Sequence, residues 1–176
     1  MTLTTKNALL ALAATASLAF AGAAYAAGGG SDSSQTQCGN GKVYDEASKS
    51  CVDQKSELND DTIYNAARQF ALAGKYDDAL KMLKRAKNQN DTRILTYYGY
   101  TNRKLGNVDV AFDYYNRAIS ADADNLLARS YMGQGLVQQG KLEEARAQLV
   151  EIRDRGGKGT YAYEALYEAL KSGSTY

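Results

Sequence analysis

The sequence has no histidine, no tryptophan and no proline. Histidine is the commonest general base of enzymes and the commonest metal ligand, so its absence argues against most hydrolase mechanisms and most metal sites. The charge is nearly balanced, with 21 lysines and arginines against 20 acidic residues. A chain without a basic excess has no general attraction to nucleic acid. We therefore expect a protein that is not an enzyme, holds no cofactor or metal, and does not bind nucleic acid.

Residues 1–26 are not expected to belong to the folded domain. Lys6 supplies a positive charge ahead of an apolar run over residues 8–20, and an Ala-Tyr-Ala tripeptide typical of signal peptidase sites ends at Ala26. We predict a signal peptide that is cleaved there, with cleavage after Ala23 as the alternative. An uncleaved membrane anchor is a further alternative, although the apolar run is short for a membrane span. The cleaved protein is predicted to be periplasmic, or secreted as the second choice, without stable membrane insertion.

Residues 38–52 contain both cysteines of the chain. They follow a stretch over residues 27–37 that is rich in Gly, Ser and Gln and typical of a flexible linker. Because an exported protein meets an oxidising compartment, we predict a Cys38–Cys51 disulfide that closes a small hairpin. So short a ribbon needs the covalent link, which is worth about 3 kcal/mol for a loop of this size. Residues 53–59 then connect the hairpin to the helical region.

The cysteine pair also has redox, metal-binding and intermolecular interpretations. Thiol–disulfide catalysts usually carry two residues between their cysteines, at the start of a helix. Here twelve residues intervene and no helix follows directly. Two thiolates alone do not complete a tetrahedral metal site. A structural disulfide is therefore favoured, and the hairpin that it closes can still present a binding loop.

Residues 60 to about 157, within a predicted helical domain over residues 60–171, carry an internal repeat. Gly74, Gly106 and Gly140 lie 32 and then 34 residues apart, and five residues after each of them comes an alanine. A period in this range is typical of stacked helix pairs. The glycines are suited to end one helix in a conformation that few other residues adopt. The alanines, at which two helices can approach closely, are Ala79, Ala111 and Ala145.

The first unit resembles a tetratricopeptide repeat, a family of two-helix units that stack into a right-handed superhelix and bind peptides or proteins. The matching residues of this unit are Ala66, Ala67, Phe70, Gly74, Tyr76, Ala79, Leu83 and Ala86. The second unit resembles the family at Leu95, Gly99, Gly106, Ala111, Tyr115 and Ala118. The third unit resembles it at Gly133, Leu136, Gly140, Leu142, Ala145 and Leu149. Departures from the family pattern occur at Asp91, where proline is usual, at Asn102, where an aromatic is usual, and at Ile152, where alanine is usual.

The resemblance implies an all-α fold, with a stack of three tetratricopeptide-like helix pairs over residues 60–171. Asn59 or Asp60 is suited to cap the first helix. Residues 160–171 form a last helix that covers the open end of the stack, because each repeat buries its apolar face only against a neighbour. The disulfide-closed hairpin precedes this domain, and residues 172–176 follow it as a tail.

In the family, the first helix of each pair lines the concave groove of the stack. The resemblance therefore implies that protein-binding residues lie on the face of these helices that is not used for packing. Residues 93, 97, 100 and 104 trace one helical stripe that combines aromatic rings with cationic donors. Packing is the alternative role for any single tyrosine. The candidate residues are Tyr64, Arg68, Arg93, Thr96, Tyr97, Tyr100, Lys104, Tyr131, Gln134 and Gln138.

The function implied by the resemblance is that of an exported, non-catalytic module that binds a peptide or protein segment in this groove. One subclass of the family holds a C-terminal carboxylate with Lys and Asn side chains. Tyr64, Arg68 and Tyr97 stand at positions where that subclass has Lys or Asn, so we expect a different ligand, such as an extended acidic or tyrosine-compatible segment. The alternative is a structural or assembly component of the bacterial envelope that uses its repeats to oligomerise or dock. The sequence does not specify the partner.

Overall fold

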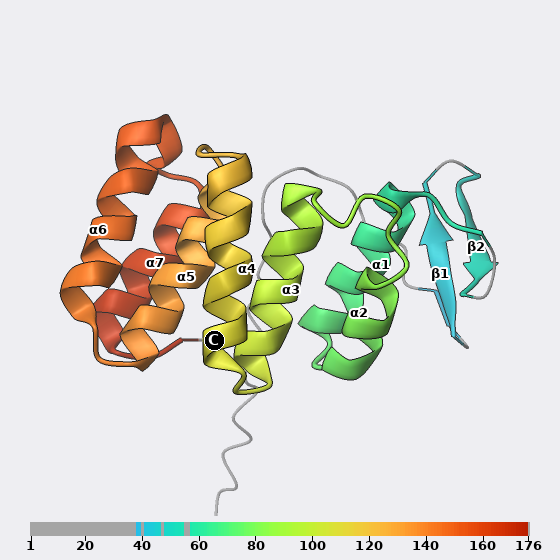
Figure 1. Ribbon diagram of the computed structural model, residues 1–176, viewed down its shortest axis with the longest axis horizontal. Helices are drawn as coiled ribbons and strands as arrows, with labels where there is room; N and C mark the ends of the chain where they lie inside the picture. The colour runs from blue at the N-terminus through green and yellow to red at the C-terminus, as the bar shows by residue number, and fades with distance from the viewer. Residues whose placement is uncertain (1–37, 40, 47, 55–56, 176) are drawn as a thin grey trace, which may run out of the picture.

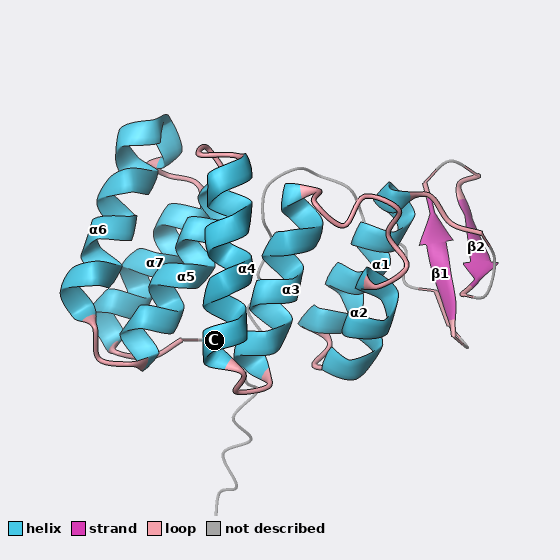
Figure 2. Ribbon diagram, in the orientation of Figure 1, coloured by secondary structure: helices cyan, strands magenta, loops and turns pink. Residues whose placement is uncertain are grey.

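The computed structural model describes residues 38–39, 41–46, 48–54 and 57–175 (Figure 1). The predicted signal peptide and linker lie outside the described residues. The described chain is mostly helical, with one short two-stranded hairpin at its start (Figure 2). Its strands are β1 (Lys42–Asp45) and β2 (Ser50–Asp53). Its helices are α1 (Asp60–Leu72), α2 (Tyr76–Leu83), α3 (Thr92–Lys104), α4 (Val108–Ala121), α5 (Leu126–Gln138), α6 (Leu142–Ile152), a π-type turn η1 (Arg153–Gly157) and α7 (Tyr161–Ser172).

The hairpin is closed by the predicted disulfide and is docked on the first helix. Cys38 and Cys51 are bonded, with their Cα atoms 5.7 Å apart, and β1 pairs with β2 in an antiparallel ladder. Val43 of β1 is buried in the core that α1 shares. The hydroxyl of Thr62 in α1 donates a hydrogen bond of 2.5 Å to Oδ1 of Asp45. Apolar packing and a hydrogen bond therefore both hold the hairpin against the helical core.

The helices form successive hairpins in chain order. α1 packs on α2, α3 on α4 and α5 on α6, and α7 packs on both α5 and α6 (Figure 1). The first helices of the pairs also contact one another, α1 with α3 and α3 with α5. We refer to the side of the molecule on which α1, α3 and α5 meet as the first-helix face.

Small residues at the predicted positions allow this packing. Gly74, Gly106 and Gly140 have φ angles of +74°, +84° and +74°, a region that favours glycine, and each ends the first helix of a pair. The predicted contact alanines, Ala79, Ala111 and Ala145, are fully buried.

Two of the departures from the repeat pattern have a local explanation. The carboxylate of Asp91 accepts a hydrogen bond of 2.8 Å from the backbone N–H of Arg93, so Asp91 caps α3 where the family has a proline. The side chain of Asn102 is buried, donates to the carbonyl of Tyr98 at 2.9 Å and accepts from the amide of Asn107. Asn102 thus links α3 to the turn that leads into α4.

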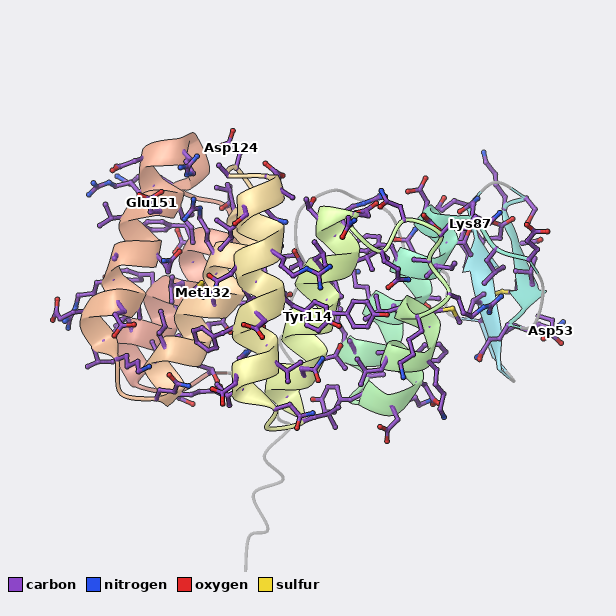
Figure 3. All side chains as sticks on the ribbon, viewed as in Figure 1. Asp53, Lys87, Tyr114, Asp124, Met132 and Glu151 are labelled. Carbon is purple, nitrogen blue, oxygen red and sulfur yellow. A yellow bond between two sulfur atoms is a disulfide. The ribbon has the colours of Figure 1, made fainter. Side chains whose placement is uncertain are left out.

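The C-terminal end of the stack is held by an ion-pair network. Arg155 of η1 pairs with Asp124 at 2.7 Å and with Glu151 at 3.2 Å, and Glu151 also lies 3.4 Å from a guanidinium nitrogen of the buried Arg129. Figure 3 places Asp124 and Glu151 at the same end of the molecule. The network ties the α4–α5 turn to α6 and η1.

Candidate functional site

Four tyrosines from three different helices form a continuous cluster along the first-helix face. Tyr64 of α1 lies edge-on to Tyr97 of α3, with 5.5 Å between ring centres. Tyr131 of α5 lies 6.3 Å from Tyr97 and 4.8 Å from Tyr100. These separations are typical of favourable aromatic pairs. We call Tyr64, Tyr97, Tyr100 and Tyr131 the tyrosine cluster.

Most of this cluster is interior, which corrects the expectation that the face is not used for packing. Tyr97, Tyr100 and Tyr131 are 1%, 3% and 2% exposed. Because α1, α3 and α5 contact one another, large rings on their facing sides fill the space between the helices. The packing alternative therefore describes these three tyrosines.

Two predicted polar residues are buried as well, contrary to expectation. Thr96 donates its hydroxyl to the carbonyl of Thr92 at 2.6 Å and accepts from the amide of Asn125 at 3.0 Å. The amide of Gln134 lies 3.3 Å from the hydroxyl of Ser130. Thr96 and Gln134 thus form hydrogen bonds inside the helix stack.

The remaining candidates are partly or fully exposed and include Tyr64, the most exposed ring of the cluster. Tyr64, Arg68 and Lys104 are half-buried, whereas Arg93 and Gln138 are exposed. The structure thus brings the predicted residues together on neighbouring helices, but it leaves only these five accessible to a ligand. We call Tyr64, Arg68, Lys104 and Gln138 the rim.

Arg93, the exposed cation among the candidates, is paired with two carboxylates. Its guanidinium pairs with Asp91 at 2.7 Å and with Asp61 at 2.8 Å, and it lies 5.1 Å from the centre of the Tyr64 ring. The hydrogen bond to Asp91 raises the pKa of Arg93, and the bond to Asp61 raises it further. A ligand carboxylate would have to compete with two others for this arginine.

The ionisation of the face is set by burial. Burial raises the pKa of Tyr64 and of Tyr97, so both keep their hydroxyl protons at neutral pH. Burial also lowers the pKa of Lys104, and the positive charge of Arg103 lowers it further. Both effects favour the neutral form of Lys104, which lies beside Arg103 in the last turn of α3.

Arg103 is a residue of this face that the sequence analysis missed. It is 4% exposed, its Nη1 donates to Oε1 of Gln138 at 3.0 Å, and its guanidinium lies 5.7 Å from the centre of the Tyr100 ring. A β-carbon built at Gly135 of α5 would lie 3.2 Å from Cδ of Arg103. Gly135 lies inside a helix and is not part of the repeat pattern. Such a glycine is a sequence signal that a side chain from a neighbouring helix passes close to the backbone.

A second surface feature lies on α4. A hollow of about 450 Å³ is lined by Val110, Asp113, Tyr114, Asn116 and Arg117. Figure 3 labels Tyr114, which stacks on Tyr98 with 4.8 Å between ring centres. Burial raises the pKa of Tyr98 to about 12. Arg117 lies over the Tyr114 ring, so one wall of this hollow combines an aromatic ring with a cation.

Comparison with protein-family models, with curated proteins and with solved structures gave no match. Function is therefore inferred from the geometry of this chain alone. Among the described residues, no helix has both the length and the apolar character that a membrane span requires. In the same part of the chain, no three cysteine or acidic side chains gather as a metal site would need.

Proposed function

We propose that this chain is an exported, non-catalytic interaction module of the tetratricopeptide type, which binds an extended segment of a partner protein along the first-helix face. Three consecutive helix hairpins with the repeated glycine and alanine positions support the family assignment. The contacts of α3 with both α1 and α5 support a continuous surface across the three pairs. A periplasmic location rests on the sequence of residues 1–26, and the Cys38–Cys51 disulfide suits such a compartment.

The observation that carries this proposal is the tyrosine cluster with its cationic rim. Rigid aromatic area beside arginine is the composition of binding hot spots. Three of the rings are buried, so the cluster supports the surface from inside. A ligand would contact the rim, which consists of Tyr64, Arg68, Lys104 and Gln138. Two of these four side chains are cationic and none is acidic, so the preferred ligand is an acidic peptide.

Binding of synthetic peptides to the oxidised full-length chain tests the proposal. The probe is an acetylated and amidated decapeptide of alternating Glu and Gly, and the neutral comparison has Gln in place of Glu. We expect the double variant Arg68→Met, Lys104→Met to bind the acidic peptide about tenfold more weakly, because both rim cations are removed.

The matched control removes two exposed cations from second helices, Lys81 of α2 and Arg146 of α6. Each of them pairs with an acid on its own helix. The variant Lys81→Met, Arg146→Met loses the same charge and should bind as the unmodified chain does. If both double variants bound the acidic peptide equally weakly, affinity would depend on net charge alone. That result would contradict binding at the first-helix face.

The second candidate function is that of an envelope assembly component. The hollow on α4 favours it, because Val110 at its edge is 46% exposed and Tyr114 and Arg117 offer an aromatic and a cation to another protein. Sedimentation velocity over a range of protein concentrations separates the two functions. A monomer at all concentrations favours the peptide-binding module, whereas a defined oligomer favours assembly.

A further inference from the structure

Arg103 is buried without a counter-charge among the described residues. No carboxylate of the described chain forms an ion pair with it, and two of its nitrogens, Nε and Nη2, are buried without a hydrogen-bond partner there. Buried arginines are normally paired, because an unpaired buried charge loses its hydration without compensation. This side chain therefore has binding capacity that the described fold does not use.

The two unused donors lie on the same edge of the guanidinium group. Nε and Nη2 point in parallel from the side opposite Nη1, and this edge can hold a carboxylate through two parallel hydrogen bonds. Nη1 is already engaged by Gln138, and the Tyr100 ring lies beside the guanidinium. The head group is thus oriented by two neighbours, while its carboxylate-binding edge is buried and makes no hydrogen bond to the described chain.

The surroundings of Arg103 favour an anion and hold the side chain in place. Lys104 is the next residue along α3, and its lowered pKa has the charge of Arg103 as its second cause after burial. The close approach of Gly135 to Cδ of Arg103 restricts the position of the aliphatic stem. A rigid guanidinium loses less conformational freedom on binding, and the neighbouring cation adds attraction for a negative charge.

We propose that Arg103 is a carboxylate-binding subsite, assisted by Lys104, that holds an acidic group of the peptide bound on the first-helix face. The subsite rests on the function proposed above, because it places the acidic group of that same ligand. Access runs past Gln138, an exposed side chain whose amide bridges Arg103 and the hydroxyl of Thr175. The carboxylate comes either from a Glu or Asp side chain of the peptide or from its C-terminus.

Three peptides distinguish the sources of the carboxylate. The first is the acetylated, amidated Glu-Gly decapeptide, which has only side-chain carboxylates. The second is the Gln-Gly counterpart with a free C-terminus, which has only the terminal carboxylate. The third is the amidated Gln-Gly peptide, which has neither. Binding of the first or the second, with no binding of the third, supports the subsite and identifies the source.

The direct readout is the side-chain Nε–H resonance of Arg103 in the ¹⁵N spectrum of the oxidised full-length chain, assigned with the variant Arg103→Lys. We expect this resonance to shift downfield when an acidic peptide is added, as hydrogen bonding to a carboxylate requires. Arg103→Met and Arg103→Lys should each bind about tenfold more weakly, because neither side chain offers two parallel donors. The control Arg146→Met, which removes an exposed arginine of α6, should bind normally.

Stability provides a second readout that a purely structural arginine would not give. Arg103→Met removes an unpaired buried charge, so its thermal midpoint should be unchanged or higher while its affinity falls. Arg103→Lys keeps the charge and decides the matter if Arg103→Met does not fold. Unchanged affinity of Arg103→Lys or Arg103→Met for the acidic peptide would overturn the proposed subsite. It would not contradict the proposed peptide-binding function. Failure of the unmodified chain to bind any of the three peptides would overturn both.

Discussion

Gly99 of α3 lies directly against the ring of Tyr115 in α4: a β-carbon built at position 99 would come within 2.4 Å of the ring. The contact joins the two helices of the middle pair, and both the ring and the neighbouring Ala111 are fully buried. A methyl group at position 99 would force the ring or the helix to move. Close packing of the middle pair therefore depends on this glycine.

We predict that Gly99→Ala lowers the free energy of unfolding by about 1–3 kcal/mol, because overpacking outweighs the gain in helix propensity. Urea denaturation followed by circular dichroism measures the change. The matched control is Gly39→Ala, since a β-carbon there meets no atom within 4 Å and the φ angle is not positive. A Gly99→Ala protein as stable as the unmodified chain would contradict the packing described for α3 and α4.

A bulkier residue at Ala111 is expected to act in the same way. Ala111 follows Gly106 by five residues and is fully buried between α3 and its neighbours. Ala111→Leu should cost about 1–3 kcal/mol of unfolding free energy in the same denaturation assay. Val110→Leu, at the exposed adjacent position, is the control and should leave the midpoint nearly unchanged.

The pairing of Asp91 with Arg93 predicts a pH dependence. The hydrogen bond from Arg93 is the largest cause that lowers the pKa of Asp91 below its ordinary value. A carboxyl whose folded pKa is depressed adds stability above its unfolded pKa of about 3.9 and loses it as the pH falls through the folded value. Asp91→Asn should therefore be less stable than the unmodified chain near pH 7.

That difference should shrink as the pH falls below about 4, since Asp91 of the unfolded chain then binds a proton before folded Asp91 does. Denaturation at pH 7, pH 4 and pH 3 measures it. The control is Asp78→Asn, because Asp78 pairs with Lys81 on the exposed face of α2 and makes only an i,i+3 contact. A constant stability difference for Asp91→Asn across this pH range would mean that its charge does not contribute.

Reduction of the disulfide should loosen the hairpin while the helices stay folded. The hairpin contacts the helical domain at α1, through Val43 and the Thr62–Asp45 hydrogen bond, and the helices pack on one another independently of it. We expect faster hydrogen exchange over residues 41–53 after reduction and an unchanged helical signal in circular dichroism. Loss of the helical signal on reduction would show that the hairpin is required for the stack.

The features that could be predicted from the sequence are local ones. The turns at Gly74, Gly106 and Gly140 depend on backbone geometry that glycine adopts readily, and the Cys38–Cys51 bond is the one internal pairing that two cysteines allow. The cap by Asn59 likewise depends on neighbours within three residues. Such features depend on residues that are close in the sequence, so they can be predicted without knowing how the helices pack.

The burial of the first-helix face could not be predicted in the same way. Whether Tyr97 and Tyr131 face a ligand or each other depends on the distance between α3 and α5, which helical periodicity does not specify. Arg103 was missed for a related reason, because it lies one position beside the predicted stripe and its role depends on Gln138 and Gly135 of another helix. Contacts between helices determine both the burial of these tyrosines and the environment of Arg103.

Hydrogen exchange of the oxidised full-length chain, with and without the amidated Glu-Gly decapeptide, tests the central claim most directly. The claim predicts slower exchange on peptide addition in α1, α3 and α5, strongest near Arg68 and Lys104, and little change in α2, α4 and α6. The Gln-Gly peptide should cause neither effect. Protection confined to α4 around Val110 and Tyr114, or no protection in α3 at a concentration where the acidic peptide binds, would contradict it.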